Sequence, residues 1–172
     1  MATGARYRVK FRRVRDGKTD YRARKQLLIS KKPRLVVRKS SKNTLAQIVI
    51  PSASGDVTLV SANTSELKKY GYTAGTGNIA SAYLAGLLLG HRAKKTGQKE
   101  AILDTGLYHT TQGGRLFAAL KGAVDAGLDI PHDPAIFPSD DRIMGKHIDK
   151  YRKTNVAEQV EAVKQKIQGE FR

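Results

Sequence analysis

Half of the positive charge of this chain lies in its first quarter, and this limits where a folded core can form. Residues 1–42 hold 16 of the 32 Lys and Arg side chains but only two of the 15 carboxylates, Asp16 and Asp20. A segment this basic, whose first apolar cluster is Leu27–Ile29, cannot bury enough surface to fold alone. We therefore expect a basic extended arm in residues 1–30, a core domain in residues 31–130, and an irregular connector with a C-terminal helix in residues 131–172.

The arm interleaves basic and aromatic side chains. Lys and Arg neutralise phosphates, and aromatic rings and guanidinium planes stack on exposed bases. Because the rest of the chain is nearly neutral, a nucleic acid is a better explanation than a tail that only keeps the protein solvated. The predicted contacts in the arm are Arg6, Tyr7, Arg8, Lys10, Phe11, Arg12, Arg13, Arg15, Lys18, Tyr21, Arg22, Arg24 and Lys25.

Several classes of protein are disfavoured. The chain has no Cys, which excludes disulfides, thiolate zinc sites and Cys nucleophiles, and its four His are scattered without metal-ligand spacing. The longest apolar run, Ile79–Leu89, is too short to cross a bilayer, and Met1–Lys25 lacks the apolar centre of a secretory signal. We expect a cytoplasmic protein with no cofactor, no metal and no membrane contact.

Three strand-like segments follow the arm, at Arg34–Lys39, Thr44–Pro51 and Val57–Ala62. Short polar turns separate them, which is typical of an antiparallel meander. The first segment places Leu35 and Val37 on one face and its two arginines on the other. The sequence leaves open whether the arginine face is merely solvated or contacts RNA as a continuation of the arm.

A helix–strand–helix pattern comes next. Ala80, Tyr83, Leu84, Leu87 and Leu88 keep the spacing of a helix that packs on the sheet. A short apolar strand at Glu100–Asp104, a second helix at Arg115–Ala126 and a possible last strand at Leu128–Ile130 follow. The predicted fold is α/β: a three-stranded antiparallel meander continued by α-β-α into a mixed sheet with helices packed on it, in ribonuclease-H-like order.

Three further helices are predicted. Arg22–Ser30 forms a short helix in the arm, and Thr64 or Ser65 caps another that ends near Tyr70. Thr154 or Asn155 caps a terminal helix. Its single apolar stripe predicts packing on the body, with docking on another protein as the alternative; the stripe is Val156, Val160, Val163 and Ile167.

The strand order also suggests a metal-dependent nuclease, which would need several carboxylates at strand ends to hold two divalent ions. Only Asp104 is placed at a strand end, because the first strand carries Arg34 and Arg38, and Asp56 is expected in a turn. One carboxylate cannot hold two metals. We therefore predict that the chain is not an enzyme and that Asp104 fixes a loop or acts as a capping acid.

Three segments resemble consecutive signatures of the large-subunit ribosomal protein eighteen family: KPRLVVRKSSKNTLAQIV, TGNIASAYLAGLLLGHRA and EAILDTGLYHTTQGGRLFAALKGAVDAGLDIPH. The arm RYRVKFRRVRDGKTDYRAR and the ending DAGLDIPH resemble its archaeal and eukaryotic branch. The resemblance implies a structural constituent of the large ribosomal subunit that binds 5S rRNA and helps to seat it in the central protuberance. It also implies contacts with large-subunit rRNA and with neighbouring ribosomal proteins.

The resemblance extends the predicted RNA contacts beyond the arm. It implies contacts from the first strand and its turn, and from the loop at residues 106–114. These residues are Lys32, Arg34, Arg38, Ser40, Ser41, Asn43, Tyr108, His109 and Arg115. The alternative function is a generic basic nucleic-acid-binding or chaperone protein without a fixed RNA target.

Overall fold

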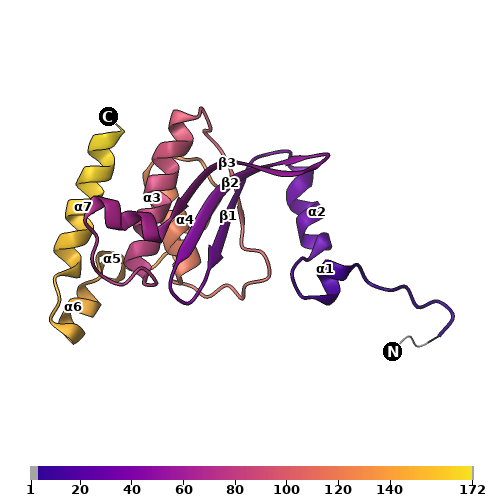
Figure 1. Ribbon diagram of the computed structural model, residues 1–172, viewed down its shortest axis with the longest axis horizontal. Helices are drawn as coiled ribbons and strands as arrows, with labels where there is room; N and C mark the ends of the chain where they lie inside the picture. Colours follow the sequence, from indigo (N-terminus) through magenta and orange to yellow (C-terminus); the bar gives the residue numbers. More distant parts are fainter. Residues whose placement is uncertain (1–3, 172) are drawn as a thin grey trace.

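A four-stranded mixed sheet lies in the middle of the protein, with the long helices on one of its faces (Figure 1). This computed structural model describes residues 4–171. The strands are β1 (Arg34–Lys39), β2 (Thr44–Ser52), β3 (Gly55–Asn63) and β4 (Ile102–Asp104). They lie in the order β3-β2-β1-β4, with β4 parallel to β1 and the other pairs antiparallel. This confirms the predicted α/β meander.

The face of the sheet toward the helices carries the core. Leu35 and Val37 of β1 are fully buried there, as are Ala46 and Ile48 of β2. We call the opposite side, which carries Arg34, the outer face. The alternation predicted for β1 is thus confirmed, because successive side chains of a strand point to opposite faces.

Two helices cover the core side of the sheet, α3 (Ile79–Lys95) and α4 (Arg115–Asp125). They pack closely because glycines meet backbone at their crossing. A Cβ atom on Gly86 would overlap the carbonyl oxygen of Ala119, and one on Gly122 would overlap that of Tyr83. The predicted last strand at Leu128–Ile130 is wrong: only a single parallel bridge forms there, between Asp129 and Glu100, because Pro131 has no N–H to continue the ladder.

The C-terminal helix α7 (Val156–Glu170) packs against α3 and the 3₁₀ helix η1 (Thr64–Tyr70). All four residues of its predicted apolar stripe are buried, which confirms packing on the body. The predicted cap of η1 is off by at least one residue, because Asn63 caps it and not Thr64 or Ser65. Asn155 occupies the predicted N-cap position of α7, but its side chain makes no cap bond, and the carboxylate of Asp149 accepts from the first amides of the helix instead.

The connector predicted to be irregular holds three short helices: η2 (Pro134–Ile136), α5 (Asp140–Met144) and α6 (Lys146–Arg152). Each of these helices has fewer than eight residues, because the prolines and the glycine of the connector end them early. Across residues 4–171, no helix is both long enough and apolar enough to cross a bilayer.

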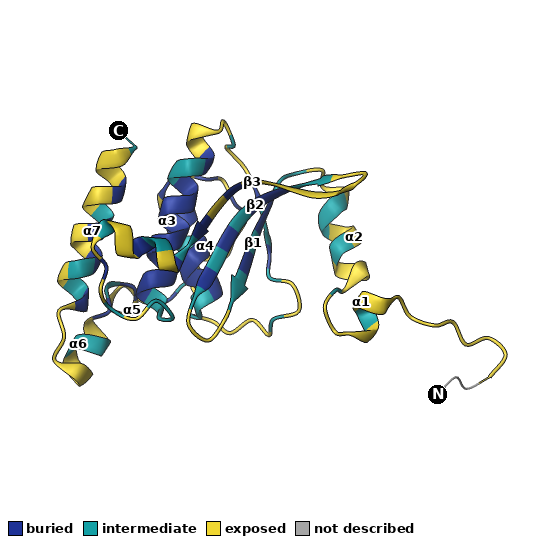
Figure 2. Cartoon of the chain, viewed as in Figure 1, coloured by how far each residue is buried: buried dark blue, intermediate teal, exposed yellow. Residues whose placement is uncertain are grey.

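The basic arm projects from this body, and most of its residues are exposed, although parts of its helices are half-buried (Figure 2). It contains a single helical turn, α1 (Arg12–Arg15), which the sequence did not predict, and the helix α2 (Tyr21–Ile29). The predicted helix at Arg22–Ser30 is confirmed with bounds shifted by one residue. Neither helix has a buried residue, so the arm adds nothing to the core.

Candidate nucleic-acid interface

Most of the cations of the arm have no carboxylate partner. Eight of them form no ion pair with any of residues 4–171, and all eight are exposed. A row of unneutralised cations on an extended segment attracts phosphates with little competition from the protein itself. The eight are Arg6, Arg8, Lys10, Arg12, Arg13, Arg15, Arg22 and Lys25.

Three predicted aromatic contacts of the arm are also exposed: Phe11 at 73%, Tyr7 at 47% and Tyr21 at 40%. Phe11 and Tyr21 meet edge to face, with ring centroids 5.5 Å apart and planes at 70°. This contact closes the loop between α1 and α2 while leaving a large part of each ring open. Such rings offer surfaces for base stacking.

The two carboxylates of the arm are engaged within it. Asp20 caps α2 by accepting from the backbone amides of Arg22 and Ala23, at 2.8 and 3.2 Å. Asp16 lies 3.5 Å from the ammonium of Lys18. Both carboxylates thus have partners within the arm, and the aspartate before α2 fixes where that helix begins.

Arg24 ties α2 to the sheet. Its guanidinium donates two parallel hydrogen bonds to the carboxylate of Asp56 on β3, at 2.8 and 2.6 Å. The same carboxylate accepts from Arg34 of β1 at 2.7 Å. Bidentate arginine–carboxylate pairs fix orientation as well as distance, so Arg24 sets the direction in which the arm leaves the body.

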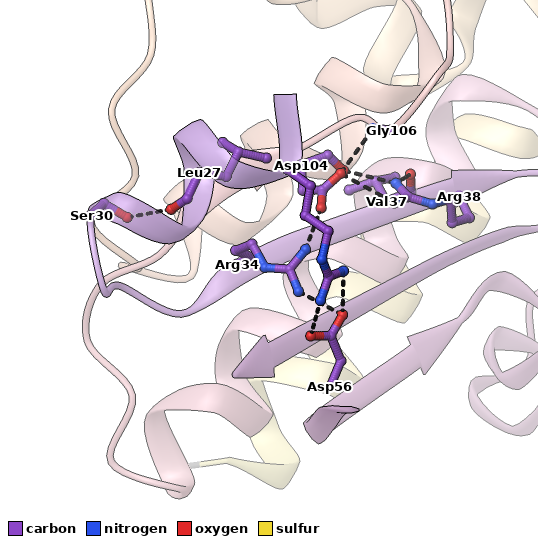
Figure 3. Close-up of polar contacts among 9 residues, drawn as sticks. Leu27, Ser30, Arg34, Val37, Arg38, Asp56, Asp104 and Gly106 are labelled. Atoms are coloured by element: carbon purple, nitrogen blue, oxygen red, sulfur yellow. Dashed lines mark hydrogen bonds and ion pairs between the residues drawn. The ribbon is translucent and has the colours of Figure 1, made fainter. Parts of the chain in front are cut away.

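Arg34 is not on an open face, and this corrects the prediction. Its side chain is 2% exposed, and its second terminal nitrogen donates to Asp104 at 2.7 Å. Figure 3 shows it held between Asp104 and Asp56. Two carboxylates already occupy this guanidinium under the cover of α2, so we leave Arg34 out of the candidate RNA-contacting surface.

Arg38 is also used within the protein. It donates to the carboxylate of Asp104 at 3.1 Å and to the backbone oxygens of Asp104 and Val37, both at 2.9 Å. Asp104 in turn accepts from the amide of Gly106 at 2.9 Å, which confirms its predicted loop-fixing role. The side chain of Arg38 remains 37% exposed, so part of it still faces solvent.

A β-bulge brings Asp56 to these arginines. Ile48 pairs with Val60, but the next residue of β2, Val49, pairs with Thr58, which leaves Leu59 without a partner. Counting by twos from buried Val60 would place Asp56 on the core side of the sheet. The extra residue reverses the alternation and turns Asp56 to the outer face. Asp56 therefore belongs to β3, and its predicted place in a turn is wrong.

The arginines change the acidity of Asp56. The bidentate contact with Arg24 lowers its pKa to about 2, with a further lowering by Arg34 and an opposing effect of burial. In return, the hydrogen bond to Asp56 raises the pKa of Arg24 above its usual value. The carboxylate is therefore ionised at neutral pH and the contact holds α2 in place.

A cleft of about 500 Å³ lies between α2 and the outer face of the sheet. Its walls combine cations of the arm with arginines of β1, and apolar side chains of α2 and the strands form its floor. Two of its carboxylates, Asp56 and Asp104, pair with arginines. Across residues 4–171 no three His, Asp or Glu side chains lie close enough to hold a metal ion. The cleft offers cationic contacts.

Two side chains hold the turn after β1 by hydrogen bonds to backbone oxygens. Arg115 donates to the backbone oxygens of Ser40 and Gly77, both at 3.0 Å, and the hydroxyl of Tyr108 donates to that of Lys39 at 2.7 Å. The structure thus gives Tyr108 and Arg115 a positioning role in the turn.

The other predicted residues in this region differ in availability. Ser40 and Asn43 bond each other across the turn, and Lys32 pairs with Glu100 at 2.6 Å. Ser41 and His109 are exposed. Their side chains make no hydrogen bond with other residues of the described range, 4–171, so both stay open to a partner.

The pairing of Arg34 with Asp56 and Asp104 was not predicted from the sequence. Asp56 is 22 residues from Arg34 along the chain, and Asp104 is 70 residues away. No local pattern connects residues so far apart. The sequence did contain one indication, the two arginines on one face of β1. If that face is covered, buried arginines need carboxylate partners nearby.

Comparison with known proteins agrees with this picture. Residues 5–101 and 93–133 match the family described as ribosomal large subunit proteins 60S L5 and 50S L18. The large ribosomal subunit protein uL18 of Methanococcoides burtonii is 51% identical over 172 residues, 99% of each chain. That of Caldivirga maquilingensis is 55% identical over 152 residues, 88% of this chain and 73% of its own. The chain therefore belongs to the archaeal branch of the uL18 family, structural constituents of the large ribosomal subunit rather than enzymes.

Proposed function

We propose that this protein binds 5S rRNA and helps to seat it in the central protuberance of the large subunit. The observation that carries the proposal is the set of eight unpaired cations and three exposed aromatic rings on an arm fixed to the body by Arg24 and Asp56. The cations contact phosphates, and the rings stack on bases that the RNA exposes in loops. Membership in a family of large-subunit proteins supports RNA as the polyanion.

The contacts assign different roles to the arm and to the core. Exposed cations without an ion pair among the described residues are scattered over the core, whereas those of the arm follow one another along a short segment. The core holds α2 through the contact between Asp56 and Arg24 and supports the turn after β1 through Arg115. Residues 1–30 thus form the RNA-contacting part and residues 31–130 the part that orients it. Exposed Ser41 and His109 extend the proposed surface along the rim of the body.

The number of phosphate contacts is measurable from the salt dependence of binding. If all eight unpaired cations contact phosphates, the plot of log K against log salt has a slope of about −6 to −7. The double variant Arg12→Ala/Arg15→Ala should make that slope shallower by about 1.4–1.8. Lys94→Ala/Lys95→Ala, which removes two exposed cations at the end of α3, is the matched control and should leave it unchanged.

Specificity is tested by filter binding of a 5S rRNA transcript in excess tRNA. Retention of the 5S complex supports the proposal, and equal competition by tRNA would instead identify a generic RNA binder. Deletion of residues 1–25 should abolish most of the salt dependence while circular dichroism still reports a folded body, because no residue of the deleted segment is buried among those described. Loss of the folded signal would show that the arm is structural.

A further inference from the structure

A second group of unneutralised cations surrounds an exposed aromatic ring at the end of α6. Tyr151 is 85% exposed, more than any other large hydrophobic side chain of the described residues. Lys150, Arg152 and Lys153 are exposed beside it and form no ion pair within residues 4–171. We call these four residues the Tyr151 patch.

The one acid of α6 is withdrawn from the patch. Asp149 accepts from the amides of Val156 and Ala157, at 2.7 and 2.9 Å, and from the hydroxyl of Thr154 at 3.0 Å. Its carboxylate is therefore directed to the start of α7 and does not neutralise its basic neighbours. The exposed end of α6 keeps a net positive charge as a result.

The backbone at the patch is also unusual. Lys153 ends α6 in the left-handed region, with φ 52° and ψ 46°, and its amide donates to the carbonyl of Asp149 at 2.8 Å. Glycine adopts this conformation without strain, whereas a side chain with a Cβ atom does not. The position thus carries a third cation at the tip of the junction between α6 and α7, at a conformational cost.

The patch is separate from the arm. Figure 1 shows α6 and the arm toward opposite ends of the longest axis of the molecule, with the sheet and the long helices between them. The exposed end of α6 is visible in Figure 2. An RNA segment held along the arm does not reach this surface without passing around the body.

The chemistry of the patch favours RNA over a protein partner. A protein interface centred on tyrosine needs apolar neighbours that exclude water, whereas the neighbours of Tyr151 are cations followed by polar Thr154 and Asn155. An exposed ring between cations provides both stacking and phosphate contacts for an unpaired strand. We propose that the Tyr151 patch binds a single-stranded segment of ribosomal RNA at a second site, independent of the arm. This goes beyond the proposed function, which concerns the arm and 5S rRNA.

The chain contains no Trp, so Tyr151→Trp creates a single fluorescent reporter at the patch. Stacking of a base on the indole ring quenches its emission. Addition of a 12-nucleotide oligouridine to full-length Tyr151→Trp should quench the emission, and the quenching should reverse at high salt. Because the signal is local, it reports on the patch whether or not 5S rRNA binds to the arm. Unchanged emission on saturation with oligouridine would overturn the proposal.

The second measurement uses fluorescein-labelled oligouridine and protein saturated with 5S rRNA. Tyr151→Ala should weaken oligouridine binding about tenfold, and Tyr151→Phe, which keeps the ring, less than twofold. Lys68→Ala/Lys69→Ala is the control: these exposed lysines adjoin Tyr70, whose hydroxyl is held by Glu170 at 2.6 Å. Equal oligouridine binding by wild type and Tyr151→Ala, or an equal loss of 5S binding, would overturn the proposal. So would protection of the patch by a ribosomal protein instead of RNA.

Discussion

Replacing Asp56 by Asn removes one negative charge from between two arginines while nearly preserving the size of the side chain. In the wild type this carboxylate accepts two hydrogen bonds from Arg24 and one from Arg34, all between 2.6 and 2.8 Å. Arg34 is buried and keeps its contact with Asp104, so its positive charge still has one carboxylate partner in the variant. Asp56→Asn therefore weakens both the docking of α2 and the network on the outer face.

The loss of stability caused by Asp56→Asn can be estimated from the pKa of the carboxylate. The pKa of Asp56 falls from 3.8 to about 2, because Arg24 and then Arg34 stabilise the charged form against the opposing effect of burial. One pKa unit corresponds to about 1.4 kcal/mol, so the shift corresponds to about 2.4 kcal/mol before any reduction for solvent screening. The side chain is 30% exposed and solvent screens part of the interaction. We expect a loss of about 1–2 kcal/mol in the free energy of unfolding at pH 7.

The pH dependence has a definite sign. Since the pKa is lowered in the folded protein, the stabilisation is complete well above pH 3.8 and disappears as the pH falls through about 2. About half of the difference between wild type and Asp56→Asn should be gone at pH 3. The two proteins should therefore become more alike in acid, although both lose stability.

Urea denaturation followed by circular dichroism measures these differences. Asp16→Asn is the matched control: it makes the same change in net charge, but Asp16 contacts only Lys18 at 3.5 Å, so its effect at pH 7 should stay within about 0.5 kcal/mol. The reasoning fails if the two variants are equally stable at pH 7. It also fails if the deficit of Asp56→Asn at pH 3 is as large as at pH 7.

Two further substitutions test the packing and the support of the turn. Gly86→Ala should destabilise the protein by about 3 kcal/mol or more in urea denaturation, because its Cβ overlaps backbone of α4, whereas Gly75→Ala, in open space, should change little. Arg115→Ala removes the donor to the carbonyls of Ser40 and Gly77 and should cost about 1 kcal/mol in thermal unfolding. A wild-type melting curve for Arg115→Ala, or equal effects of the two glycine variants, would contradict these assignments.

The elements with a strong local period were predictable from the sequence. The meander, the helix α3 and the apolar stripe of α7 all formed where periodicity placed them, because burial of one face selects a period of 2 or 3.6 residues. The ends of elements were less predictable. The caps of η1 and α7 come from Asn63 and Asp149, and only the second required a residue brought in from another helix.

The sequence by itself indicated the class of partner, because a surplus of positive charge on a segment with few apolar residues favours a polyanion whatever the fold. It also determined the α/β order, since side-chain periodicity is a local property. Only the tertiary structure decided which cations are free. Arg34 and Arg24 have the same charge as Arg12, but the bulge in β3 and the parallel pairing of β4 bring Asp56 and Asp104 to the first two. Such pairing depends on register between distant strands, which the order of residues along one strand does not reveal.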